Sequence, residues 1–198
     1  MGTPRSDFDE AVAYYVKVVS EVTPDQWGLP ARGTQTVLQV AAQGSRPLTT
    51  TRDFLAAGAE VEEIHNTVGY FVRSKPVDAE TAAGIQRRGA EALERLQSGD
   101  PATIVTDLAA QVLGPVHASA DDAMVGTQFG GMRLLPYLPT RTLELMTCAI
   151  EIAHAIGSAT VPPDGPIEAV AHLLSEIAIA NHKGALLVRV LWTQVQLA

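Results

Sequence analysis

Two carboxylates and a thiol recur at helical spacing near the middle of the C-terminal half. Glu144, Cys148 and Glu151 are four and three residues apart, so a helix places them along one line on one face. Carboxylates at such positions can transfer protons, and a thiolate can act as a nucleophile or a metal ligand. This face is either a solvated stripe or the wall of a polar pocket. Because free cysteine prefers burial, the pocket is the favoured interpretation.

Arginines flank the start of the same helix. Arg133 and Arg141 lie on either side of the junction between a glycine- and proline-rich loop and the helix. Either guanidinium could anchor an anionic substrate in a bidentate pair, and an ion pair to Glu144 or Glu151 is an equally good interpretation. His65 lies one residue from the apolar stripe of an earlier helix. Arg133, Arg141, Glu151 and His65 are therefore the candidate substrate-binding residues.

The helix that carries the acidic and thiol groups is predicted to begin at Thr140, a good N-cap, and to end before Gly157. Its opposite arc is apolar and should face the core. The preceding residues 119–139 show no periodic pattern, so the sequence predicts a long loop there. Gly130 and Gly131 in that loop are best explained by a need for positive φ.

Helical periodicity extends over most of the chain. Helices are predicted at about 6–22, 36–43, 49–75, 78–97, 100–115, 140–156, 164–182 and 184–191, the last followed by an extended end. Gly44 and Pro47 should end the second of these helices. No credible set of strands is present. Residues 1–198 are therefore predicted to form a single all-α domain, an up-and-down helical bundle.

Composition excludes several classes of partner. The chain has 198 residues, a net charge of −8 and no basic cluster, which disfavours nucleic acid and anionic membrane surfaces as partners. Cys148 is the only cysteine, so no internal disulfide can form and a reducing compartment fits. Residues 1–10 are acidic and lack the apolar stretch of a secretory signal. We expect a cytoplasmic protein that does not enter the membrane.

A family resemblance rests on the run GMRLLPYLPTRTLELMTCAIEIAHAIG, residues 131–157. It resembles the DinB-like superfamily, in particular the N-terminal metal-binding domain of mycothiol-dependent maleylpyruvate isomerases, which typically read PtR-x-x-E-x-x-x-H-x-x-D. Trp27 and the predicted helix 36–43 occupy the place of the family's earlier signature, a tryptophan before a helix that carries a histidine. The resemblance covers about residues 7–180 and implies a DinB-like four-helix bundle with additional short helices.

The resemblance also implies a divalent-metal site, and this sequence departs from it. The family's histidine, glutamate and histidine ligands correspond to Gln43, Glu144 and Cys148, and Glu151 replaces the family's aspartate. Neutral glutamine is a poor ligand for transition metals, so we expect no catalytic metal and no other cofactor. A weak zinc or nickel site at Gln43, Glu144 and Cys148 remains the alternative if the thiol is deprotonated.

Three functions are compatible with these residues. The favoured one is a metal-free, small-molecule enzyme of isomerase or cyclase type in bacterial specialised metabolism. In it, a desolvated Glu144 transfers protons, Gln43 donates a hydrogen bond to a carbonyl or oxyanion, and Cys148 is a less favoured nucleophile. The second is a divalent-metal-dependent transferase or isomerase that uses a thiol such as mycothiol. The third is a non-catalytic protein that binds a ligand or a partner. The sequence leaves the substrate and the oligomeric state open, with a homodimer among the options.

Overall fold

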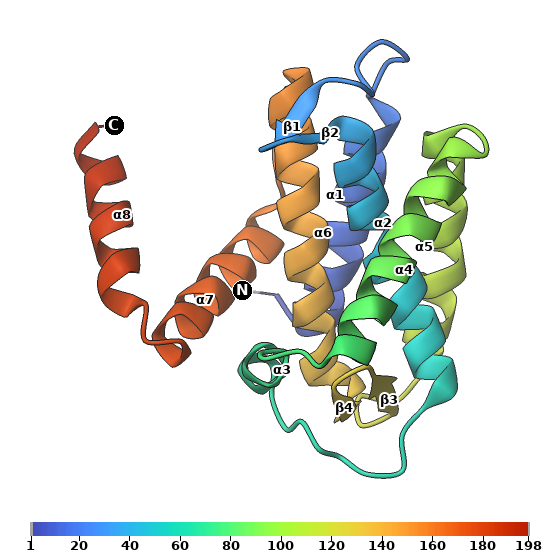
Figure 1. The fold of residues 1–198 in the computed structure, drawn as a ribbon, viewed down its shortest axis with the longest axis vertical. Coiled ribbons are helices and arrows are strands. Elements are labelled where there is room, and N and C mark those ends of the chain that lie inside the picture. The colour runs from blue at the N-terminus through green and yellow to red at the C-terminus, as the bar shows by residue number, and fades with distance from the viewer. Residues whose placement is uncertain (1, 198) are drawn as a thin grey trace.

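The computed structural model describes residues 2–197, and helices dominate this part of the chain (Figure 1). The helices are α1 (Pro4–Ser20), α2 (Val37–Ala57), α3 (Thr67–Arg73), α4 (Ala79–Gln97), α5 (Pro101–Ala118), α6 (Leu134–Ile156), α7 (Asp164–Ala180) and α8 (Gly184–Leu197). Two short antiparallel pairs interrupt them: β1 (Pro30–Arg32) with β2 (Gln35–Thr36), and β3 (Met124–Thr127) with β4 (Gly130–Arg133). The prediction of an all-α fold is confirmed.

Four of the long helices form the bundle that holds the core. α6 packs against α1 and α2, and α5 packs against the same two helices. The long helices α1, α2, α4, α5 and α6 alternate in direction along the chain (Figure 1). α4 lies outside the four and packs against α2 and α5. Large apolar and aromatic side chains fill the centre, among them Phe8, Tyr15, Leu145, Met146 and Ile152, all fully buried. The apolar arc predicted for α6 is therefore the core face.

The second helix is longer than predicted, because α2 continues through Pro47 as far as Ala57. Proline removes one intrahelical hydrogen bond, but residues on both sides of it are buried in the core, among them Val40 and Leu48. Gly44 does not end the helix. A Cβ there would lie 2.5 Å from the Tyr15 ring and 2.9 Å from Cβ of Cys148, so this glycine leaves room for the Tyr15 ring and for the Cys148 side of α6.

The prediction of one helix over 49–75 is wrong in its second half. α2 ends at Gly58, which has φ 62°, and an irregular segment leads to the short helix α3. His65 lies in that segment and is exposed. It therefore does not flank the apolar stripe of a helix.

The segment 119–139 is an ordered hairpin and the first turns of α6, not a loop. β3 and β4 pair from Met124–Arg133 to Thr127–Gly130, and the N–H groups of Leu134 and Leu135 donate to carbonyls of the preceding segment. These bonds satisfy donors that a helix N-terminus leaves free, so α6 begins at Leu134 instead of Thr140. Of the two glycines, only Gly130 has a positive φ, 127°.

The C-terminal helices form an arm beside the bundle. α7 packs on α1, α3 and α6, whereas α8 packs on α7 and stands away from the bundle (Figure 1). The prediction of an extended end after Leu191 is wrong, because α8 continues to Leu197. Val188 and Trp192 of α8 are 67% and 65% exposed. Within residues 2–197, no helix is both long and apolar enough to cross a membrane.

Candidate functional site

An arginine that the sequence analysis did not single out connects three of the predicted site residues. Arg32 ends β1, and its Nη1 donates to Oε1 of Gln43 at 3.0 Å. Its Nε pairs with the carboxylate of Glu151, and its Nη2 lies 3.7 Å from Sγ of Cys148. One guanidinium thus connects the β1–β2 pair to α2 and α6. The contact spans 119 positions of sequence, which is why no local pattern indicated it.

The position of Arg32 tests whether the residues suit a divalent metal. The guanidinium is a permanent cation, and it already occupies the space between Gln43 and Cys148. Burial raises the pKa of the Cys148 thiol to about 11, although Arg32 acts in the opposite direction. A thiol that is neutral near pH 7 is a poor metal ligand and a poor nucleophile. The set Gln43, Glu144 and Cys148 therefore does not fit a divalent ion in this structure.

Arg141 and Glu144 form an ion pair on α6. Nη2 of Arg141 lies 3.1 Å from Oε1 of Glu144, and Nη1 donates to Oε2 at 3.3 Å. Arg141 also donates to the Tyr70 hydroxyl at 3.1 Å and to the Thr140 hydroxyl at 2.9 Å. Its guanidinium carbon lies 5.2 Å and 5.0 Å from the ring centres of Tyr70 and Tyr137. Of the two sequence-based interpretations of Arg141, the structure shows the ion pair.

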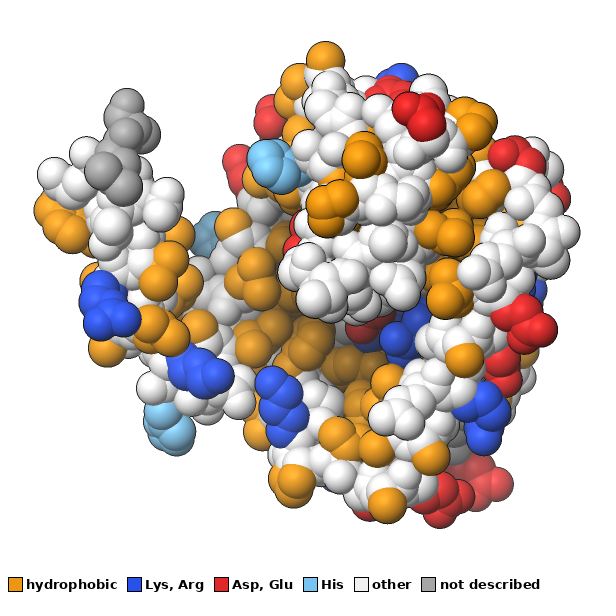
Figure 2. Space-filling view, turned by 45° about the horizontal axis from the view of Figure 1, so that its top comes forward, with side chains coloured by type: hydrophobic (Ala, Val, Ile, Leu, Met, Phe, Trp, Pro, Cys, Tyr) orange, Lys and Arg blue, Asp and Glu red, His pale blue; other side chains and the backbone are white. Residues whose placement is uncertain are grey.

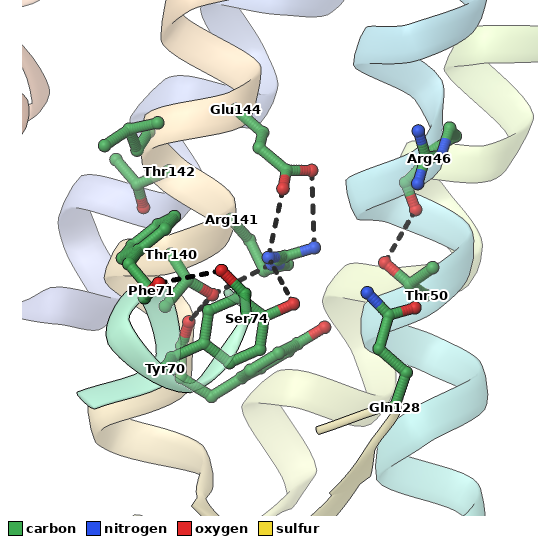
Figure 3. Close-up of polar contacts among 12 residues, drawn as sticks. Arg46, Thr50, Tyr70, Phe71, Ser74, Gln128, Thr140, Arg141, Thr142 and Glu144 are labelled. Carbon is green, nitrogen blue, oxygen red and sulfur yellow. Dashed lines mark hydrogen bonds and ion pairs between the residues drawn. The ribbon is translucent and has the colours of Figure 1, made fainter. Parts of the chain in front are cut away.

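The environment of Glu144 differs from the desolvated pocket that the sequence suggested. Its side chain is 34% exposed, whereas that of Arg141 is 4% exposed. Figure 3 shows Glu144 projecting from α6 toward the side on which Arg46 of α2 lies. Figure 2 shows that the molecule is hollowed between α3, α4 and α6, with charged side chains at the back of the hollow. Glu144 is thus fixed from one side and open to solvent on the other.

Within residues 2–197, Gln43 and Glu144 are not joined by a hydrogen bond, and each accepts from a different arginine, Arg32 and Arg141 respectively. Gln43 lines a pocket of about 330 Å³ between α2 and α4. Since its Oε1 accepts from Arg32, its amide nitrogen keeps both donors available. This arrangement supports Gln43 as a hydrogen-bond donor.

Two of the predicted site residues belong to a separate surface cluster. Nε of Arg133 pairs with Glu62 at 2.9 Å, and Nδ1 of His65 lies 3.7 Å from the same carboxylate. Arg133 is 51% exposed and His65 is 72% exposed. Both are held by the segment between α2 and α3, so the structure does not bring them to Gln43, Cys148 and Glu151.

Two further arginines were missed: Arg46 lines the same pocket as Gln43, and Arg88 lies close to Arg46. Arg46 follows Gln43 by one helical turn on α2, and Arg88 of α4 donates to Oε1 of Gln128. The side chain of Arg88 is partly buried. Burial lowers the pKa of Arg88, and the charge of Arg46 lowers it further. If the sequence analysis had predicted one helix through Pro47, Arg46 would have been placed on the same helix face as Gln43, because residues three apart share a face.

No family model, curated protein or solved structure matches the chain.

Proposed function

We propose that the chain is a metal-free, small-molecule enzyme of isomerase or cyclase type, with its site formed by side chains of α2 and α6. The observation that carries this proposal is the guanidinium of Arg32 among residues that the DinB-like resemblance assigns to a metal and its surroundings. A fixed positive charge there organises the polar groups of both helices. In place of a metal ion, the protein's own acid–base and hydrogen-bonding side chains then catalyse the reaction.

Glu144 is the group that moves the proton. Its carboxylate is oriented by Arg141, which is itself held by Thr140, Tyr70 and Tyr137. Its exposed side remains free to meet a substrate. An oriented carboxylate within reach of an acidic C–H can remove the proton and return it at another position, which isomerises the substrate with no net change in atoms. Arg141 is a positioning residue in this scheme.

Gln43 is the complementary donor. Arg32 holds its amide oxygen, so the amide N–H groups are directed to other partners. An amide donor near a substrate carbonyl stabilises the negative charge that develops on oxygen when the neighbouring carbon loses its proton. The same pair of groups could hold a flexible substrate in a reactive pose for ring closure.

Proton exchange tests this proposal without knowledge of the natural substrate. A panel of small carbonyl compounds is incubated with the protein in D₂O, and loss of the C–H signal next to the carbonyl is followed by NMR. We expect exchange with the native chain, and little or none with Glu144→Gln. Native-like circular dichroism of the variant establishes that it is folded. Equal exchange rates in the two proteins contradict the role of Glu144.

The two alternatives give different results. Near-stoichiometric zinc or nickel that is lost in Glu144→Ala favours the metal-dependent, thiol-using enzyme. A compound that binds without turnover, and with the same affinity in Glu144→Gln, favours a non-catalytic binding protein.

We also propose that a second copy of this chain covers α8. This helix is apolar on most of its surface, and such helices are normally buried. Residues 182–198 contain Lys183 and Arg189 but no acidic residue, whereas the whole chain has a net charge of −8. The segment that contains α8 is thus opposite in charge to the chain as a whole, and in a two-fold symmetric dimer each copy can cover the α8 of the other.

Light scattering after size-exclusion chromatography tests the dimer. We expect a dimer for the native chain and a monomer for Trp192→Glu. Val161 is 80% exposed and lies outside α8, so Val161→Glu is a matched control that should stay dimeric. A monomeric native chain contradicts the proposal.

A further inference from the structure

The pocket between α2 and α4 contains hydrogen-bond donors without matching acceptors. Its walls are formed by Gln35, Gln39, Ala42, Gln43, Arg46, Gly89, Ala90 and Leu93. None of these residues is acidic, although the chain as a whole has a net charge of −8. The pocket volume of about 330 Å³ is within the range that accommodates a small organic molecule.

Two of the pocket's glutamines have their acceptor oxygens occupied. Oε1 of Gln39 accepts from the backbone N–H of Thr36 at 2.9 Å, as part of the cap of α2. Oε1 of Gln43 accepts from Arg32 at 3.0 Å. In both cases the amide nitrogen, which can only donate, is left for other partners. The side chains that line this part of the pocket therefore offer N–H groups.

Arg46 adds an uncompensated positive charge. Its guanidinium has no hydrogen bond or ion pair with any residue in the range 2–197, and its Nε is buried without a partner. Arg88 is close enough for the two charges to repel each other, and Nε of Arg88 is likewise buried without a partner. Both groups are partly dehydrated, and no carboxylate among the described residues forms an ion pair with Arg46. A ligand of opposite charge would remove this electrostatic cost.

We propose that this pocket binds an organic anion through a carboxylate or phosphate group, held by Arg46 and by the amide groups of Gln39 and Gln43, with Arg88 adding to the positive potential. Since Gln43 also belongs to the proposed reaction site, this inference names the substrate class for that site and rests on the proposed function. The anionic group of the substrate binds on the α2–α4 side, and the reacting carbon extends toward Glu144 on α6.

Direct binding of simple probes tests the site. Phenyl phosphate, benzoate and the uncharged benzyl alcohol are titrated against the full chain, with binding followed by NMR shift changes. We expect one or both anions to bind and the alcohol not to bind. Comparing the affinities of phenyl phosphate and benzoate shows whether the pocket prefers a phosphate or a carboxylate. Arg46→Gln should weaken anion binding by about tenfold, the loss typical of one charge-assisted contact. Arg88→Gln should weaken it by a smaller factor, because Arg88 adds to the potential without contacting the anion. Within residues 2–197 neither arginine forms an ion pair, and Arg88 loses only its hydrogen bond to Gln128, so both variants should fold.

Arg87→Gln is the matched control, because Arg87 neighbours Arg88 but is 71% exposed. It should bind the anions as the native chain does. Binding that is equal in all variants, or absent for every anion, overturns the proposal. Glu144→Gln separates this inference from the proposed function. If the native chain and Glu144→Gln both bind the anions but neither catalyses proton exchange, only the proposed reaction is contradicted. Glu144-dependent exchange without anion binding contradicts only the anion site.

Discussion

The ion pair between Arg141 and Glu144 gives the sharpest prediction on stability, because its two members differ in exposure. Arg141 is 4% exposed and Glu144 is 34% exposed. Breaking a fully buried pair costs about 3–5 kcal/mol, and the exposure of Glu144 reduces that cost by solvent screening. We therefore expect Glu144→Gln to lower the free energy of unfolding by about 1–2 kcal/mol. The residual loss arises because a buried guanidinium keeps only neutral partners.

Arg141→Met completes a double-mutant cycle. Methionine can occupy the space between the rings of Tyr70 and Tyr137, but the hydroxyls of Tyr70 and Thr140 lose the N–H donors at 3.1 Å and 2.9 Å. We expect a loss of about 1–2 kcal/mol for this variant too. The double variant should be less destabilised than the sum of both, by about 1 kcal/mol, because the uncompensated charge is gone.

Urea denaturation followed by circular dichroism at pH 7 measures the four proteins of the cycle. The coupling should persist in high salt, because burial of Arg141 shields the pair from counterions. Losses that add within about 0.3 kcal/mol would refute the reasoning, since independent sites behave in that way.

Three further outcomes follow from the contacts. Because the pKa of Cys148 is about 11, iodoacetamide should modify it at pH 8 at least about 100-fold more slowly than a free cysteine, and rapid labelling contradicts this. The pKa of Glu21 is lowered to about 2, chiefly by the hydrogen bond from Ser158. Its contribution to stability should be present above about pH 4.5 and lost as the pH falls toward 2, so Ser158→Ala should raise the acid-unfolding midpoint, and an unchanged midpoint contradicts this. In thermal melts, Gly44→Ala should destabilise by about 2 kcal/mol, because its Cβ would lie 2.5 Å from the Tyr15 ring. Gly114→Ala, where no atom lies within 4 Å, should not destabilise, and equal melting temperatures contradict the packing argument.

The helical fold could be predicted because local signals and core packing agree. The helices predicted from residues 78 and 100 begin there, with Asp78 and Asp100 as the N-caps of α4 and α5, and the apolar arc of α6 is buried. Prediction was wrong where tertiary contacts override local preference. Pro47 lies inside a continuous helix that has buried residues on both sides of the proline, and the hairpin before α6 depends on pairing that has no helical period.

The candidate site could be predicted only where its residues share one helix. Glu144, Cys148 and Glu151 lie on one face of α6 as expected, and Cys148 is buried. Arg32 could not be found in this way, because a flexible arginine in a hairpin shows no pattern that identifies its distant partners. The DinB-like relationship, the homodimer and the cytoplasmic location stay predictions.

Metal analysis of protein purified without chelators tests most directly whether a guanidinium, and not a divalent ion, organises the centre of this site. We predict zinc and nickel contents far below one ion per chain, unchanged in Glu144→Ala. Arg32 already pairs with the carboxylate of Glu151 and donates to Oε1 of Gln43 and to Sγ of Cys148. Close to one zinc or nickel ion per chain, lost in Glu144→Ala, would contradict the account.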